Sequence, residues 1–183
     1  KDDYKQKIFG RTAKDTLKHL YNNQLTEEKL SQLTSERIDI AIKMIKTKLK
    51  LPDGLRNLLA LLNKNKIHLA IATSSRIKYV DFVINETRIR RYFKFILTAE
   101  DINTGKPHPE IYLKTAGKLK VDPNDCVVFE DSISGIMAAR KAGMKVIAIT
   151  TTHAKTELRE ADRVIASFTE VDCSMLKEVL SNT

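Results

Sequence analysis

Two adjacent carboxylates, Glu130 and Asp131, come directly after a short apolar run at residues 127–129. Such a run suits a strand buried on both faces of a parallel sheet, and open α/β sheets carry their chemistry at the carboxyl ends of their strands. Adjacent carboxylates repel each other unless a metal ion or a basic group compensates, and oxygen ligands favour a hard ion such as Mg²⁺. The alternative is a solvated turn that caps a helix, because Asp and Ser both cap well. The pair alone leaves both interpretations open.

Hydroxyl side chains follow another predicted strand, at residues 67–72. Thr73, Ser74 and Ser75 stand there, before a helical pattern. Backbone N–H groups, hydroxyls and a helix dipole can therefore converge on one anion at this turn. The same residues would also serve as plain helix caps.

A lysine stands in a stiff loop after a third predicted strand, at residues 95–97. Lys106 precedes Pro107, and Pro109 suits the first turn of a helix predicted at residues 110–120. A cation held in such a loop can neutralise a phosphate or a carboxylate. The alternative is that Lys106 is one of many surface lysines.

The stretch after the acid pair predicts a helix and then a second buried strand at residues 146–149. Small residues recur at i, i+3, i+4, i+7 and i+8, a spacing that lets a helix backbone lie close to a sheet. They are Gly135, Ala138, Ala139, Ala142 and Gly143. The whole stretch is predicted to form a strand, an acidic turn, a helix and a strand.

The pattern divides the chain into two regions. Residues 1–50 have helical periodicity and no strand candidate, which predicts a small helical cap subdomain. Within it Arg11, beside Gly10, either faces a ligand or is an exposed loop cation. Strands and helices alternate over residues 51–183, which predicts an α/β core with a Rossmann-like parallel sheet, right-handed crossovers and flanking helices.

Composition narrows the classes of function. The chain has 183 residues, 42% of them hydrophobic and 30% charged, as in soluble globular proteins. Its formal net charge is +9, but the cations are interleaved with apolar residues and only 6% of residues are aromatic, so we expect no nucleic-acid partner. The two cysteines lack metal-ligand spacing, and no apolar run or signal pattern indicates a membrane. We therefore expect a cytoplasmic monomer with a small anionic substrate.

Three motifs occur in order along the chain: Thr73-Ser74 after a strand, Lys106 before Pro-x-Pro, and Glu130-Asp131 before Ser-x-x-Gly. This set resembles the haloacid dehalogenase (HAD) superfamily, in the branch of β-phosphoglucomutase and related small-molecule phosphatases. The likeness covers nearly the whole chain. It implies that the Thr73 hydroxyl and the Ser74 N–H bind the transferring phosphoryl group. It further implies that Lys106 bridges the phosphate and the nucleophile, and that Glu130 and Asp131 hold Mg²⁺.

The first motif of that family has no counterpart here. It is an Asp-x-Asp pair at the end of the first strand, whose leading Asp becomes an aspartyl-phosphate while the second acts as general acid and base. Asp2 and Asp3 cannot replace it, because no apolar strand precedes them. We therefore expect the nucleophile upstream of this sequence, and the chain as given to be inactive. We also expect a gap in the sheet where the family has its first, central strand, between the strands at 67–72 and 127–129.

The resemblance implies a Mg²⁺-dependent phosphatase of a small phosphorylated metabolite, in the first place a sugar phosphate. A phosphohexomutase is the nearest alternative. Ala13 stands where the mutase's cap has the arginine that grips a second phosphate, with Arg11 two positions earlier, and this departure favours a phosphatase. A truncated, non-catalytic module that binds phosphate or a partner is the alternative from another class.

Overall fold

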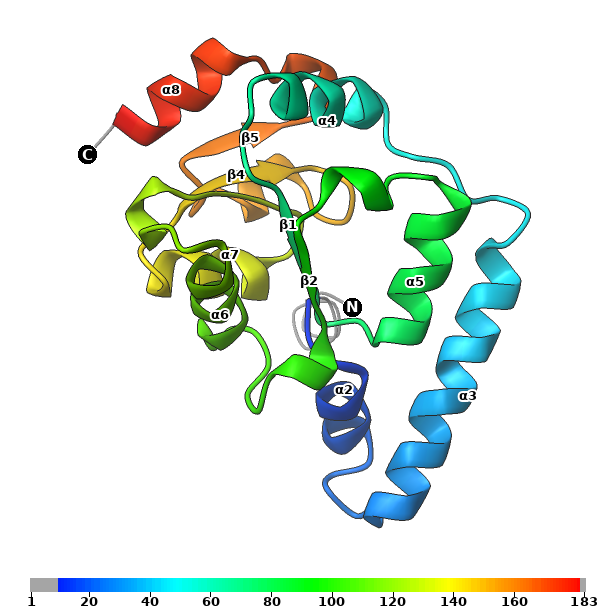
Figure 1. Cartoon of the computed structure of the whole chain (residues 1–183). Coiled ribbons are helices and arrows are strands. Elements are labelled where there is room, and N and C mark those ends of the chain that lie inside the picture. The colour runs from blue at the N-terminus through cyan, green and yellow to red at the C-terminus, as the bar shows by residue number, and fades with distance from the viewer. Residues whose placement is uncertain (1–9, 182–183) are drawn as a thin grey trace.

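All five strands found in residues 10–181, the part of the chain that the computed structural model describes, pair in parallel. Strands β1 (Ala70–Ala72) and β2 (Phe95–Leu97) form one sheet. Strands β3 (Val127–Glu130), β4 (Lys145–Ile149) and β5 (Arg163–Ile165) form a second sheet in that order. Helices flank both sheets, so the predicted α/β class with parallel sheets is confirmed (Figure 1).

Helices cover both faces of the second sheet. The core helices are α4 (Leu55–Lys64), α5 (Ile77–Glu86), α6 (Glu110–Leu119), α7 (Ile133–Lys141) and α8 (Cys173–Ser181). Short 3₁₀ helices occur at Arg90–Tyr92, Ala99–Asp101, Pro123–Asp125, Lys155–Glu157 and Phe168–Glu170. Ile147 and Ile149 of β4 pack in a core with α4 and α8, whereas Val146 and Ala148 pack in a core with α6 and α7. Within residues 10–181, no helix has both the length and the apolar character needed to cross a membrane.

A pair of helices lies in the region predicted to form a cap, at the end of the molecule beyond the β1–β2 sheet (Figure 1). These helices are α2 (Ala13–Leu20) and α3 (Glu27–Ile45). The hydroxyl of Thr12 accepts a hydrogen bond from the Asp15 N–H (3.1 Å) and so begins α2. An exposed ion pair between Lys78 of α5 and Asp39 of α3 (2.5 Å) connects these two helices. Residues 10–50 contain helices and turns but no strand, and the domain boundary at residue 50 stays a prediction.

The segment from β3 to β4 forms the predicted strand, turn, helix and strand. The Ser132 hydroxyl caps α7 by accepting a hydrogen bond from the Gly135 N–H (3.1 Å). Ala138 and Ala139 are completely buried against the sheet, as the spacing of small residues predicts. Gly143 lies beyond the end of α7 with φ +79°, so it serves the turn into β4 and not the helix face.

The two sheets are not joined within the described part of the chain, because β1 and β3 belong to different sheets. An apolar cavity of about 550 Å³ lies between them, lined by both strands and by α4 and α6. Strand β1 begins only at Ala70, later than the predicted start at residue 67. A gap was expected between these two strands, and the absence of a first strand from this chain remains a prediction.

Candidate active site

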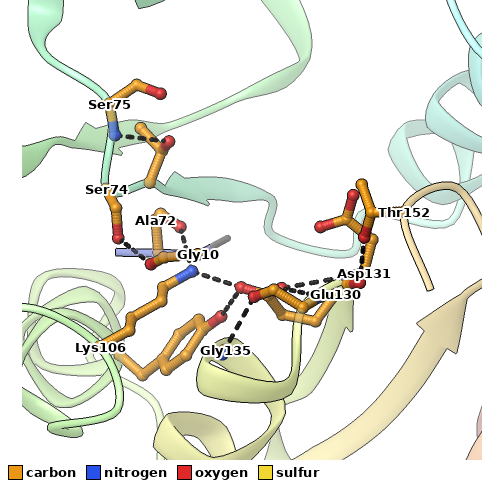
Figure 2. Close-up of polar contacts among 12 residues, drawn as sticks. Gly10, Ala72, Ser74, Ser75, Lys106, Glu130, Asp131, Gly135 and Thr152 are labelled. Atoms are coloured by element: carbon orange, nitrogen blue, oxygen red, sulfur yellow. Dashed lines mark hydrogen bonds and ion pairs between the residues drawn. The ribbon is translucent and has the colours of Figure 1, made fainter. Parts of the chain in front are cut away.

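The carboxyl ends of β1 and β3 bring the three predicted motifs together. Lys106 Nζ lies 2.5 Å from Oε1 of Glu130, the last residue of β3. The same ammonium donates a hydrogen bond to the carbonyl oxygen of Ala72, the last residue of β1 (3.3 Å). Thr73 and Ser74 follow Ala72 directly, so the hydroxyl turn, the lysine and the acid share one site (Figure 2).

Glu130 is the most heavily bonded side chain of this site. Its Oε1 accepts from Lys106 Nζ and from the Tyr112 hydroxyl (2.8 Å). Its Oε2 accepts from the backbone N–H groups of Asp131 (3.0 Å) and Ser132 (3.1 Å), and from the Ser132 hydroxyl (2.9 Å). The carboxylate therefore has five donors, and the compensating cation that an acid pair requires is supplied by Lys106.

The surroundings of Glu130 keep it ionised although it is buried. Burial favours the neutral acid, but the charge of Lys106 and the hydrogen bonds outweigh it, so the pKa of Glu130 lies below its usual value. The pKa of Tyr112 is raised well above its usual value by burial and by the negative charge of Glu130. The lowered pKa of Glu130 and the raised pKa of Tyr112 thus favour a carboxylate that accepts a hydrogen bond from a neutral phenol.

Asp131 has a different environment from its neighbour. It is half-buried, and the Thr151 hydroxyl donates to its Oδ2 (2.9 Å). Its backbone carbonyl accepts a hydrogen bond from the Thr152 hydroxyl (2.5 Å) and lies 2.9 Å from His153 Nδ1 (Figure 2). The loop after β4 therefore fixes the backbone of Asp131 and contacts one of its carboxylate oxygens.

The hydroxyl turn after β1 is held by backbone groups. Thr73 Oγ1 accepts a hydrogen bond from the Ser75 N–H (3.1 Å), and the Ser74 hydroxyl donates to the carbonyl of Gly10 (2.7 Å). The amino end of α5 already contacts a carboxylate, because the Ile77 N–H donates to Glu100 (3.1 Å). An anion at Thr73 and Ser74 would therefore be bound by the hydroxyl and N–H groups of the turn and by Lys106, and less by the first N–H group of α5.

Arg11 lies beside this turn, since the preceding residue, Gly10, accepts the hydrogen bond from Ser74. Gly10 has φ +77°, and a side chain there would collide with the hydroxyls of Ser132 and Ser134. Arg11 is half-buried, and its Nε is enclosed with no hydrogen-bond acceptor among the described residues. The structure thus places Arg11 next to the site and not in an exposed loop.

Two residues of the site were not found from the sequence. Tyr112 occupies a core position of α6, and nothing in the local pattern distinguishes its hydroxyl from that of any buried tyrosine. Glu110 accepts hydrogen bonds from the N–H groups of Asn103 (3.0 Å) and Thr104 (2.8 Å), just before Lys106. The sequence pattern around residues 110–112 therefore gave no specific signal for either residue.

The acid pair does not by itself fit a metal centre. Among residues 10–181, no three or more His, Cys, Asp or Glu side chains are grouped so that they could hold one ion. Glu130 already has Lys106 as its cation, and a metal ion would have to displace it. Asp131, whose carboxylate makes a hydrogen bond with Thr151, retains lone pairs that suit a hard cation. Asp131 therefore fits as one ligand of a Mg²⁺ site, and Glu130 in this geometry does not.

Comparison with known proteins identifies the family. The haloacid dehalogenase-like hydrolase family matches residues 1–149. The chain belongs to this family. A solved HAD hydrolase of family IA, variant 3, from Entamoeba histolytica is 33% identical, with a TM-score of 0.85 over 96% of this chain and 81% of that chain. β-Phosphoglucomutase from Clostridium difficile shares the HAD fold, with a TM-score of 0.86 at 23% identity over 98% of this chain and 82% of that chain.

Two curated relatives of this chain have phosphatase names. Validoxylamine A 7'-phosphate phosphatase of Streptomyces hygroscopicus subsp. limoneus is 35% identical over 65% of this chain and 56% of its own length. Hexitol phosphatase B of Escherichia coli is 32% identical over 72% of this chain and 60% of its own length. The chain thus spans little more than half the length of these two relatives.

Proposed function

We propose that the protein is a Mg²⁺-dependent phosphatase of a small phosphorylated metabolite, with sugar phosphates as the substrate class. The observation that carries the proposal is the convergence of Lys106, the Thr73–Ser74 turn and Asp131 at the carboxyl ends of β1 and β3. A cation, hydroxyls and backbone N–H groups suit the charge of a phosphoryl group. The names of the two phosphatase relatives support both the reaction and the substrate class.

In this proposal each residue has a separate task. The Thr73 hydroxyl and the Ser74 N–H bind phosphoryl oxygens, and Lys106 balances the negative charge between the phosphate and the nucleophile. Arg11, with its enclosed Nε beside the turn, binds the substrate from the cap side. Asp131 contributes one oxygen ligand to Mg²⁺, which supplies further neutralisation of phosphate charge when bound.

The nucleophile in this proposal is an aspartate on a segment that precedes the sequence given. The apolar cavity between β1 and β3 supports this, because its lining suits a buried strand and both strands direct their carboxyl ends to Lys106. The greater length of the phosphatase relatives is compatible with such a segment. The chain without that segment is then expected to bind phosphate but not to turn it over.

Phosphate release by the protein with its upstream segment, measured against a panel of phosphorylated metabolites, tests the proposal. We expect release from one or more sugar phosphates with Mg²⁺ and none with EDTA. Absence of release from every phosphomonoester in the presence of Mg²⁺ would refute it. Isomerisation of a hexose phosphate with a bisphosphate primer, with little free phosphate, would show the mutase alternative instead.

A further inference from the structure

The side chain of Glu130 turns back into the core and not toward the open part of the site. It contacts the first turn of α7, where Gly135 leaves room for the carboxylate, because a Cβ at that position would collide with it. Ser132, the N-cap of the same helix, donates both its N–H and its hydroxyl to Oε2. The helix N-terminus therefore stabilises this negative charge in a buried position.

Lys106 shares this buried position. The side chains of Lys106 and Glu130 are only 5% and 8% exposed. A buried ammonium without a counter-ion is strongly destabilising, and Glu130 is the carboxylate that the described residues bring to Lys106. If Glu130 turned outward to bind a metal ion, it would leave five donors and an uncompensated cation behind.

Tyr112 contacts both members of the pair. Its hydroxyl donates to Glu130 Oε1 (2.8 Å), and the Lys106 ammonium lies 4.7 Å from the centre of its ring. One aromatic side chain thus supplies a hydrogen bond to the acid and a cation–π contact to the base. Being 4% exposed, Tyr112 also closes this side of the pair from water.

We propose that Glu130 is the counter-ion that positions Lys106, that Tyr112 is a second positioning residue for Lys106, and that Asp131 alone of the acid pair is available to a metal ion. This division of roles deepens the proposed function and depends on it only for the identity of the metal. The ion pair is formed by two side chains of this chain, so it can be tested without measuring phosphate release.

Thermal unfolding in EDTA gives the first test, on the wild type, Glu130→Gln, Lys106→Met and the double variant. We expect each single substitution to lower the Tm by on the order of 10 °C, because each leaves a buried charge unpaired. The decrease in Tm of the double variant should be clearly smaller than the sum of the decreases of the two single variants, because neither charge remains. If Glu130→Gln is as stable as the wild type, or if the two losses add, Glu130 is not the counter-ion of Lys106.

A spectroscopic signature separates positioning from general stability. In protein labelled with ¹⁵N-lysine, the buried Lys106 ammonium should give a slowly exchanging signal that Lys106→Met removes. We expect Tyr112→Phe, which keeps the ring, to broaden or shift this signal and to lower the Tm by a few degrees. Asp131→Asn, the matched control, should leave the signal unchanged and the Tm in EDTA within about 2 °C of the wild type.

The milder Tyr112→Phe variant also keeps the proposal testable if Glu130→Gln does not fold. A Lys106 signal that Tyr112→Phe leaves unchanged would overturn the role of Tyr112. A Lys106 signal that Asp131→Asn abolishes would overturn the division of roles between the two acids. Stabilisation by Mg²⁺ that Glu130→Gln removes while Asp131→Asn retains would likewise contradict it.

Discussion

The carboxylate of Glu130 occupies the space in which a side chain at Gly135 would begin. If the carboxylate moved aside, it would lose hydrogen bonds from the five donors around it, at a cost in free energy. We therefore expect Gly135→Ala to lower the free energy of unfolding by about 2–4 kcal/mol, although alanine favours helices more than glycine does. Urea unfolding measures this change.

Gly117→Ala is the matched control for that substitution. Gly117 is an exposed residue of α6, and no atom lies within 4 Å of the position its Cβ would take. Here alanine should stabilise the protein by up to about 1 kcal/mol. Equal effects of the two substitutions would show that Gly135 is not needed to seat Glu130.

Lys106 should be essential to turnover in the longer protein that carries the proposed upstream nucleophile. Removing a cation that balances phosphoryl charge in a water-poor site costs on the order of 10²–10³ in kcat. We expect Lys106→Met to lower kcat/KM by that factor in a phosphate-release assay. Lys118→Met, on the exposed side of α6, is the control and should remain near wild-type activity. A loss below tenfold for Lys106→Met would contradict its role.

Arg11 should act on substrate binding. Its half-buried guanidinium lies beside the Ser74 turn, so Arg11→Ala should raise KM by about 10-fold and change kcat less, as expected when a charged hydrogen bond to substrate is lost. Steady-state kinetics on the preferred substrate measures this. Arg91→Ala, near the amino end of β2 and remote from the site, should change neither constant. An unchanged KM for Arg11→Ala would exclude Arg11 from the substrate site.

The loop before Lys106 should keep its structure far into the acid range. Hydrogen bonds from Lys114 and from the Asn103 and Thr104 N–H groups lower the pKa of Glu110 to about 2. A lowered folded-state pKa means that the stabilisation is complete above the ordinary value near 4.5 and is lost as the pH falls toward 2. The NMR amide shifts of Asn103 and Thr104 in the folded protein should therefore change with a midpoint near pH 2. Movement centred at 4.5 would show that Glu110 does not hold the loop.

Sequence patterns predicted the elements well where local apolar runs decide them. The runs at residues 95–97, 127–129 and 146–149 all correspond to strands of the parallel sheets. The run at 67–72 was only partly right, because β1 pairs with β2 from Ala70 onward. Within the described residues β1 has a partner on one side alone, so its length is limited to the residues that pair with β2.

The chemistry of the acid pair depended on contacts that local patterns cannot show. Two adjacent carboxylates predict a cation that compensates their repulsion. From the sequence alone this cation could be either Mg²⁺ or a basic side chain. Lys106 is the compensating cation because the loop before α6 places its ammonium next to Glu130, a residue 24 positions later in the chain. Gly135 was recognised as part of a small-residue stripe, but its task of admitting a carboxylate is visible only in three dimensions.

Phosphate release from sugar phosphates tests the central claim most directly, measured on the longer protein that carries the proposed upstream nucleophile and on its Asp131→Asn variant. We predict Mg²⁺-dependent release by the wild type and a loss of at least about 10²-fold in the variant, because Asp131 is the metal ligand that this turn supplies. Wild-type protein that releases no phosphate from any phosphomonoester with Mg²⁺ present, or an Asp131→Asn variant as active as the wild type, would contradict the proposed site.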